Sequence, residues 1–484
     1  MKRLNLRALT ALASVFLYAC SAWLSAADGG LDTSFGSANT GIVDIDYPDS
    51  DNDAVLSLLQ TAGGALLGTG TVASQGDFVL GGVQLTADGS LDATFGAGGF
   101  GKKVDREPIN YNSGTAIVRS NGQIVVAVKQ EDQYFGASVF SADFNTIASE
   151  DFTLNGGNGT YQITQTRLAL DAADDSVLIL ACSGSGDIDI WRYEASPNQT
   201  GPESRSHITQ TDAASCGKSP NVGLQSTRSI VAAFNSGSPG GRGGFTPDYG
   251  TLKVIRYNAD GSQNGDFGSA GASTIGVPSL FTEIFIEAMA VQPDDSIVMA
   301  GEVRGGSGSS AFLVRLLANG NLDTSFGDQG FVIVSFPDAN GIANVDFGLF
   351  DSVAVQSDGK IVAAGNYGSD QSQEYSFAMA RVTASGVSDS SFGNNGIVQL
   401  SPTDGWDDQR TALVIQPSGK IVVGTASANN QSMRFARFLS SVDSDAEAPA
   451  NGTDSATPVP ALPLLGLGIL ASLLGFFGLR KLKQ

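Results

Sequence analysis

The sequence predicts an all-β protein whose main body is a seven-bladed β-propeller. The composition is rich in glycine, with 61 residues in 484, and only 16% of the residues are charged. No internal stretch shows a sustained helical period, which favours short strands joined by tight turns. A unit of about sixty residues also recurs along the chain, as is typical of repeat folds.

The first repeated signal is a tight turn followed by an apolar strand, as in QSDGKIV at 356–362 and QPSGKIV at 416–422. Asp-Gly and Ser-Gly pairs supply the positive φ that such turns need. The first apolar residue after the turn marks seven units: Leu66, Ile124, Val177, Ile230, Ile297, Ile361 and Ile421. Successive marks lie 53 to 67 residues apart, which defines the period.

The second repeated signal is the motif LDTSFG or a near copy, which follows the third apolar segment of each clear unit. The motif phenylalanines are Phe35, Phe95, Phe267, Phe326 and Phe392. One complete unit contains four predicted strands, at 351–356, 360–366, 376–383 and 396–400. Four antiparallel strands, repeated seven times, predict the blades of a propeller.

The two ends of the repeat array predict how the ring closes. The seventh unit stops after its third strand, at 434–439, and has no LDTSFG motif. The mature chain begins instead with an unpartnered LDTSFG at 31–36 and a strand at 41–45. We therefore expect the N-terminal strand to complete the seventh blade, because closure removes the exposed sheet edges.

These motifs resemble the delta-60 repeat family of bacterial proteins, in which a VQPDGKIVVAG-like strand pair and an LDxSFG-like turn recur. The resemblance covers roughly residues 29–439 and implies a β-propeller. It implies no established catalytic residues, because the motif positions look like turn and core determinants. Units three and four, at about 144–271, depart most from the pattern and contain long polar segments such as 235–250.

The first 26 residues have the form of a secretory signal peptide. Basic residues at positions 2, 3 and 7 precede an apolar run at 8–24, and the small residues that follow predict cleavage after Ala26. An alternative is lipoprotein processing at Cys20, which the bulky Tyr18 fits poorly. Both alternatives predict export.

The C-terminal segment predicts a membrane anchor. Residues 459–479 carry no charge and are followed by Arg480, Lys481 and Lys483. As a helix this span reaches about 30 Å, which is enough to cross a bilayer. The basic end should remain in the cytoplasm and place the body outside. The polar, acidic stretch at 441–458 predicts a flexible stalk between the propeller at 27–440 and this anchor.

The same segment resembles the sorting signals of the PEP-CTERM class in Gram-negative bacteria, which a membrane-embedded exosortase is thought to process. The matching features are VPALP at 459–463, the Gly-rich apolar span, and the basic end at 480–483, with Ala461 in place of the typical Glu. The resemblance implies contact with a sorting protease and transfer to the cell surface or release. The alternative is a plain anchor at 459–484 that is never cut.

The acidity of the chain argues against nucleic acid as a partner. The net charge is -22, and six of the 27 basic residues lie at the two extreme ends, which leaves 21 basic against 49 acidic residues, or -28. Such a surface repels phosphate backbones. The charge instead favours solubility.

Few residues suggest chemistry. His207 lies in the polar segment SRSHITQTD without metal-ligand neighbours, and an exposed loop histidine is expected. Asp49, Asp51 and Asp53 alternate as in a calcium loop, but Ala54 replaces the required Gly. An acidic turn or a weak calcium site remain the two alternatives. No catalytic, cofactor-binding or metal-binding residues are predicted.

Two further features are expected to be structural. Cys182 and Cys216, the two cysteines of the exported chain, either form one bridge between the third and fourth units or stay free. Trp191 is expected to pack within its blade.

Arginines recur late in the third strand, and aspartates recur three residues before the motif phenylalanine. The arginines are Arg192, Arg256, Arg315, Arg381 and Arg437, and the aspartates are Asp32, Asp92, Asp323 and Asp389. We expect a guanidinium to bind a turn carboxylate in the blades that have both, with Asp32 serving Arg437 after closure. The alternative is a ring of arginines that reads an anionic ligand.

For function, the sequence favours a non-catalytic surface module that binds an unknown protein or glycan through loops on one face. An extracytoplasmic polysaccharide hydrolase or lyase that uses carboxylates from different blades is the alternative, since such acids leave no local motif. A purely structural role in the cell envelope is a third. A deep central pocket with converging acids or arginines would favour the enzyme.

Overall fold

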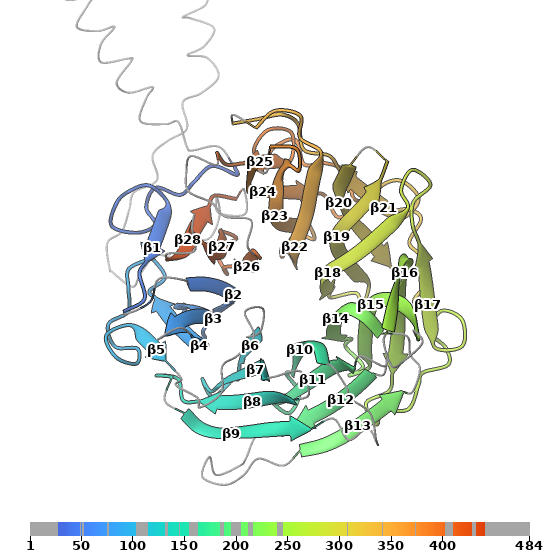
Figure 1. Ribbon diagram of the computed structural model, residues 1–484, viewed down its shortest axis with the longest axis horizontal. Coiled ribbons are helices and arrows are strands. Elements are labelled where there is room, and N and C mark those ends of the chain that lie inside the picture. The colour runs from blue at the N-terminus through green and yellow to red at the C-terminus, as the bar shows by residue number, and fades with distance from the viewer. Residues whose placement is uncertain are drawn as a thin grey trace, which may run out of the picture. The chain divides into compact units, whose positions relative to one another are not determined.

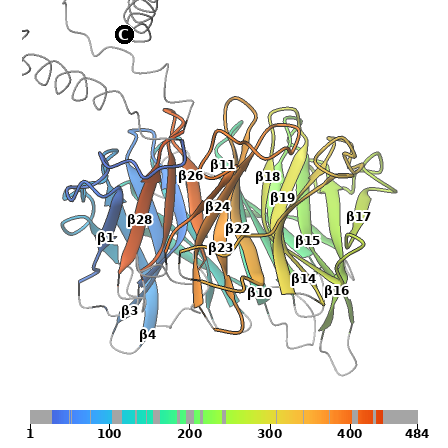
Figure 2. The same ribbon diagram turned by 90° about the horizontal axis from the view of Figure 1, so that it is seen from above.

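The computed structural model describes residues 28–440 except 49, 51–52, 75–76, 103–114, 131–133, 145, 154–162, 184–187, 195–204, 212–215, 240–244, 307, 341, 373, 402–409 and 428–431. These residues form seven four-stranded antiparallel sheets arranged as blades around a central axis (Figure 1). Seen edge-on, the strands stand side by side around the ring (Figure 2). The predicted all-β seven-bladed propeller is confirmed.

Each blade is built from strands that are consecutive in the sequence, apart from the seventh. Blades 1 to 4 comprise β2 (Asp53–Gln60), β3 (Leu66–Ser74), β4 (Asp77–Leu85), β5 (Phe100–Lys102); β6 (Thr115–Val118), β7 (Ile124–Gln130), β8 (Tyr134–Phe140), β9 (Thr146–Thr153); β10 (Ile163–Asp171), β11 (Ser176–Ser183), β12 (Ile188–Tyr193), β13 (Arg205–Thr211); β14 (Cys216–Leu224), β15 (Ile230–Pro239), β16 (Phe245–Tyr257) and β17 (Ala272–Gly276). Blades 5 to 7 comprise β18 (Glu283–Val291), β19 (Ile297–Gly305), β20 (Gly308–Leu316), β21 (Phe331–Val334); β22 (Phe347–Val355), β23 (Ile361–Ser369), β24 (Glu374–Val382), β25 (Ile397–Gln399); and β26 (Ala412–Ile415), β27 (Ile421–Ala426), β28 (Met433–Phe438), β1 (Ile42–Ile45).

Closure occurs through the N-terminal strand, as predicted. Strand β1 pairs antiparallel with β28, with Ile42 opposite Ala436 and Ile45 opposite Met433. An additional bridge joins Leu31 to Phe438. The sheet order β1-β28-β27-β26 therefore combines the first and last strands of the propeller in one blade.

The hydrophobic core consists of packing between neighbouring blades. Each of the seven junctions, including that between blades 7 and 1, has its own cluster of buried apolar side chains. Between blades 5 and 6, for example, Val298 and Leu313 pack with Phe350 and Ile361. Because both faces of most sheets are covered in this way, strands such as β23 are buried along their whole length.

The LDTSFG motif and the glycine turns meet at these junctions. Gly386 has a φ of 82°, and a Cβ at this position would lie 3.0 Å from the ring of Phe326 in the preceding blade. Gly320 stands in the same relation to Phe267, with a φ of 85° and a contact of 2.8 Å. Glycine is thus required at each of these two turns for two reasons: the backbone is left-handed, and a Cβ would collide with the phenylalanine ring.

Units three and four keep the four-stranded plan despite their divergent sequences. Much of the polar segment at 235–250 belongs to strands, because β15 continues to Pro239 and β16 begins at Phe245. Cys182 on β11 and Cys216 on β14 form a disulfide with Cα atoms 5.9 Å apart. The bridge joins blade 3 to blade 4, which is the first of the two alternatives for these cysteines.

The predicted signal peptide at 1–26, stalk at 441–458 and C-terminal segment at 459–484 lie outside the described residues. Within the part of the chain that the structure describes, no helix is long and apolar enough to cross a bilayer.

Candidate functional site

His207 is exposed, as predicted, but it lies on a strand, so the predicted loop is wrong. It lies on β13, the outermost strand of blade 3, where its Nε2 is 2.9 Å from Oδ1 of Asp189. Its ring stands 4.6 Å from that of Trp191, which packs against the core between blades 2 and 3. The polar sequence is misleading because an outermost strand has one face in solvent, so few of its residues need to be apolar.

The acidic run at 49–53 is described only in part, since Asp49 and Asp51 lie outside the described residues. Asp53 is fully buried at the start of β2. It accepts hydrogen bonds from the backbone N–H of Tyr47, at 3.2 Å, and from the hydroxyl of Ser50. Among the described residues, no group of three or more His, Cys, Asp or Glu side chains is arranged to hold a metal ion.

The repeated arginines bind turn carboxylates, as predicted. The guanidinium of Arg315 donates to Asp323, that of Arg381 to Asp389, and that of Arg437 to Asp32, at 2.7, 2.8 and 2.7 Å. The two remaining arginines have other partners: Arg256 donates to Asn264, and Arg192 to Asp171. Asp92 accepts instead from Gln84, eight residues earlier.

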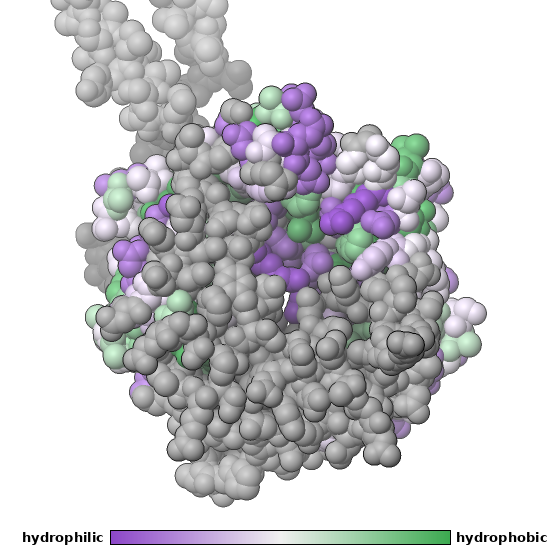
Figure 3. Space-filling model, in the orientation of Figure 1, coloured by the Kyte–Doolittle hydropathy of each residue, from purple (hydrophilic) through white to green (hydrophobic). Residues whose placement is uncertain are grey.

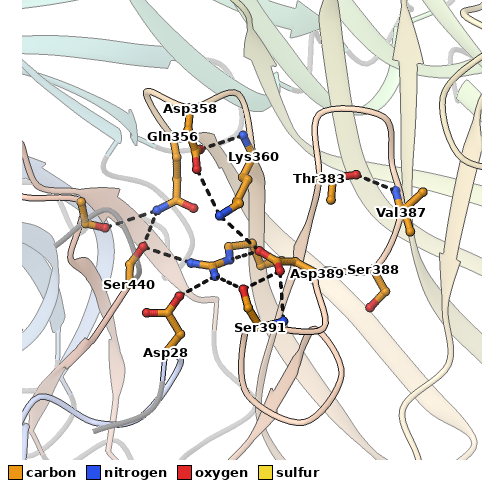
Figure 4. A network of polar contacts seen from close by, with 12 residues as sticks. Asp28, Gln356, Asp358, Lys360, Thr383, Val387, Ser388, Asp389, Ser391 and Ser440 are labelled. Carbon is orange, nitrogen blue, oxygen red and sulfur yellow. Dashed lines mark hydrogen bonds and ion pairs between the residues drawn. The ribbon is translucent and has the colours of Figure 1, made fainter. Parts of the chain in front are cut away.

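Four of these arginines, all except Arg192, also join their blade to the next, which the sequence did not predict. Arg256 and Arg315 donate to the backbone carbonyls of Ala318 and Ala384 in the following blades. Arg381 donates to Ser440 beyond β28 and to Asp28 at the N-terminal end (Figure 4). Four of the five guanidinium groups, all except that of Arg192, also stack on a motif phenylalanine, and for Arg381 the distance to the ring centre of Phe392 is 4.3 Å. The repeated arginines therefore stabilise turns and blade junctions, and they do not form a ligand site.

The candidate functional site is instead a pocket of about 290 Å³ in the central channel. All seven innermost strands or their lead-in residues line it, because the first strand of every blade faces the axis. Hydrophilic side chains gather around the hollow near the middle of the face in Figure 3. The pocket is therefore a polar cavity enclosed by the whole ring.

β-bulges aim acidic side chains into this pocket. The register of β18 against β19 shifts between Ile286 and Ala288, and that of β22 against β23 shifts between Phe350 and Ser352. The extra residue is Glu287 in the first case and Asp351 in the second, and both line the pocket. A bulge lets two consecutive residues face the same side of a sheet, so these acids reach the channel without disrupting the ladder.

The acids from blades 5 and 6 meet an arginine from blade 7. Nη2 of Arg410 donates to Oε2 of Glu287 at 2.8 Å, and the two side chains are 27% and 17% exposed to the channel. Asp351 accepts longer hydrogen bonds from the backbone N–H of Thr411, at 3.3 Å, and from the amide of Asn366, at 3.4 Å. Three successive blades thus contribute to one polar cluster.

Burial raises the pKa of the Asp351 carboxyl to about 7, with the charge of Arg410 opposing the rise and that of Glu287 adding to it. Burial, together with the nearby Arg410, lowers the pKa of Arg167 to about 10. The pKa of Arg410 itself is raised: burial opposes this, and the charges of Glu287 and Asp351 outweigh it. The pocket therefore holds a carboxyl group that is near half-protonated at neutral pH.

Hydroxyl and amide side chains complete the lining. Ser57, Thr115, Asn221 and Thr411 can donate or accept hydrogen bonds, and apolar residues such as Met289 lie between them. A concave site in which a small number of polar groups converge is typical of small-molecule binding, and here the polar groups form much of the lining. A volume of about 290 Å³ suits one small molecule or one residue of a longer chain.

Sequence reasoning missed this site because its residues lie in four different units. A signal was nevertheless present: Arg167, Glu287 and Asp351 are charged residues inside the first strands of their units. A charge at such a position is costly unless it is paired or has a use, so it marks a candidate site.

Solved structures align with this chain at low similarity. Sqt1 from Chaetomium thermophilum is 13% identical, with a TM-score of 0.42, over 80% of this chain and 85% of its own. PorZ of Porphyromonas gingivalis is 12% identical, with a TM-score of 0.45, over 81% and 47%. The polysaccharide lyase Uly1 is 9% identical, with a TM-score of 0.46, over 87% and 95%. Such values carry no argument for a shared ligand or activity.

No curated protein sequence matches the chain. Two segments, residues 292–326 and 356–392, match a family described as domain of unknown function (DUF5122) beta-propeller. Each segment begins beside the turn before the second strand and ends at the motif phenylalanine, Phe326 or Phe392. In blades 5 and 6 the chain is therefore similar to the DUF5122 beta-propeller domain.

Proposed function

We propose that this protein is an exported, membrane-anchored propeller that binds a small polar ligand, or one residue of a glycan, in its central channel. The observation that carries the proposal is the pocket into which Glu287, Asp351, Arg167 and Arg410 converge from four blades. The proposed location outside the cytoplasm rests on the predicted signal peptide and C-terminal anchor. The sequence favoured binding through surface loops, whereas the pocket favours binding in the channel.

The proposal can be tested by filling the channel. Ala412→Phe places a large ring where a methyl group lines the pocket, and we expect it to reduce glycan or small-molecule binding at least tenfold. The measurement is a screen of the full chain against a glycan array, followed by titration of any hit. Val387→Phe, at a position that is 61% exposed, is the matched control and should bind as the wild type does. Equal binding by all three proteins would place the ligand on the loops.

An enzyme is the second candidate, and one observation favours it. Burial raises the pKa of Asp351 to about 7, and Glu287 from the adjacent blade lines the same pocket. Two carboxyl groups in different environments are what acid–base cleavage of a glycan requires. If the site is catalytic, Asp351→Asn should abolish the release of new reducing ends from a bound polysaccharide while binding persists. If the wild type binds the polysaccharide but does not cleave it, the enzyme hypothesis is rejected and the binding function is retained.

A further inference from the structure

The seven blades can be compared at one position that faces the channel. In each blade this residue pairs with the residue three positions after the first apolar residue of the second strand. Ser57 pairs in this way with Thr69, and Ser352 with Ala364. The seven equivalent residues are Ser57, Thr115, Arg167, Asn221, Ala288, Ser352 and Ala412. All seven line the pocket.

Arg167 is the exception among these seven residues. The other six have short side chains, so the blade geometry does not demand a long or charged residue here. Burial lowers the pKa of Arg167 to about 10, which means that its charged form is destabilised by the site. A long, charged side chain that lines the pocket at a position where the repeated blade geometry does not call for one suggests a role in binding.

Arg410 adds a second positive charge to the same pocket. It lies immediately before Thr411 and β26, it lines the pocket, and its side chain is 27% exposed. The contact with Glu287 uses one of its five N–H donors. The charge of Arg410 contributes to the lowered pKa of Arg167, so the two guanidinium groups lie near each other.

The charges of the described lining residues do not cancel. Arg167 and Arg410 contribute two positive charges and Glu287 one negative charge, while Asp351 is near half-protonated at pH 7. The pocket is thus positive, by up to one unit, inside a protein whose net charge is -22. A single negative charge on the ligand would complement it.

We propose that the ligand of the central channel is a hydroxylated monoanion whose carboxylate group is held by Arg167 and Arg410. This inference rests on the proposed function, because it presupposes that the channel binds a ligand. The planar guanidinium matches the two oxygens of a carboxylate. Ser57, Thr115 and Asn221 line the same pocket and can bind ligand hydroxyl groups.

Three related sugars provide the test. Glucuronate and glucose differ only at C6, which is a carboxylate in the first and a hydroxymethyl group in the second. Glucosamine keeps the hydroxymethyl group of glucose and carries an ammonium group at C2. Binding to the full chain in a non-ionic detergent is measured by saturation-transfer NMR and by the shift in Tm. We expect glucuronate to bind at least tenfold more tightly than glucose, and glucosamine to bind least. This comparison on the wild type requires no variant.

Arg167→Ser tests the assigned residue, because serine occupies the equivalent position in blades 1 and 6. We expect the variant to keep its Tm and to lose the preference for glucuronate. Arg304→Ser is the control, since Arg304 pairs with Glu302 and is not among the pocket-lining residues. It should keep the preference.

Other outcomes would overturn the inference. A preference for glucose or glucosamine would refute the carboxylate assignment and leave the channel as a binding site. A Tm lowered by Arg167→Ser with the glucuronate preference intact would make Arg167 a structural residue. If none of the three sugars binds and the glycan array is also blank, the proposed function fails together with the inference.

Discussion

Replacing Arg381 with alanine should lower the free energy of unfolding by about 3–5 kcal/mol, the usual loss when one member of a buried ion pair is removed. Its side chain is 0% exposed and binds Asp389 at 2.8 Å and Asp28 at 2.7 Å. It also covers the ring of Phe392 and donates to Ser440 (Figure 4). The variant would leave two largely buried carboxylates without their cation and would weaken the junction between blades 6 and 7.

A double-mutant cycle measures this interaction. The free energies of unfolding of Arg381→Ala, Asp389→Ala and the double variant would be obtained by chemical denaturation. We expect the double variant to lose less than the sum of the single losses, by about 0.5–3 kcal/mol. Strict additivity would show that the two side chains do not interact.

Arg315→Ala provides a comparison within the same protein. Arg315 binds Asp323 in the equivalent geometry, but its side chain is 14% exposed. Water reaches this pair more easily, so a smaller loss is expected than for Arg381. An equal loss would indicate that burial does not control the strength of the arginine–aspartate interaction.

Asp351→Asn should stabilise the protein at pH 8 by about 2–4 kcal/mol and change its stability little at pH 4. The folded protein raises the pKa of this carboxyl from 3.8 to about 7, so the unfolded chain loses the proton first as the pH rises. Stability is therefore lost between about pH 4 and pH 7, at about 1.4 kcal/mol for each unit of pKa difference. Asparagine carries no charge and keeps an oxygen that can accept from the N–H of Thr411.

The measurement is the free energy of unfolding of wild type and variant between pH 4 and pH 8. Arg410, Glu287 and Glu302 carry charge around Asp351, as does Arg167, and all four are unchanged in the variant. Asp328→Asn, on an exposed turn, is the control and should leave the pH profile as it is. Parallel profiles for wild type and Asp351→Asn would contradict the raised pKa.

The fold was predictable because its determinants are local and repeated. A tight turn before each second strand, with glycine in four of the seven blades, and the LDTSFG motif specify bends, and the number of repeats gives the number of blades. The unpartnered motif at 31–36 correctly placed the N-terminal strand in the last blade. The pairing of Arg315 with Asp323 was predictable for the same reason, since the two residues keep a constant separation of eight across one turn.

The pocket was not predictable, because it depends on which faces of seven distant strands meet on the axis. Glu287 and Arg410 are separated by 123 residues and touch only when the ring is closed. The bulge that turns Asp351 into the channel leaves no clear pattern in an otherwise apolar strand. The hydrogen bond from Arg315 to the carbonyl of Ala384 was not predictable either, because it forms only when two repeats pack together.

The pairing of β1 with β28 has a consequence for the order in which the chain assembles. Asp44 and its partner Arg434 are separated by 390 residues. At a synthesis rate of about 5–20 residues per second, the first strand therefore waits roughly 20–80 s for its partner to be made. Blades 1 to 6 each contain four consecutive strands and can form while the chain is still growing. The strand that leaves the ribosome first is thus among the last to be placed, and the ring has no closed state until synthesis has passed β28.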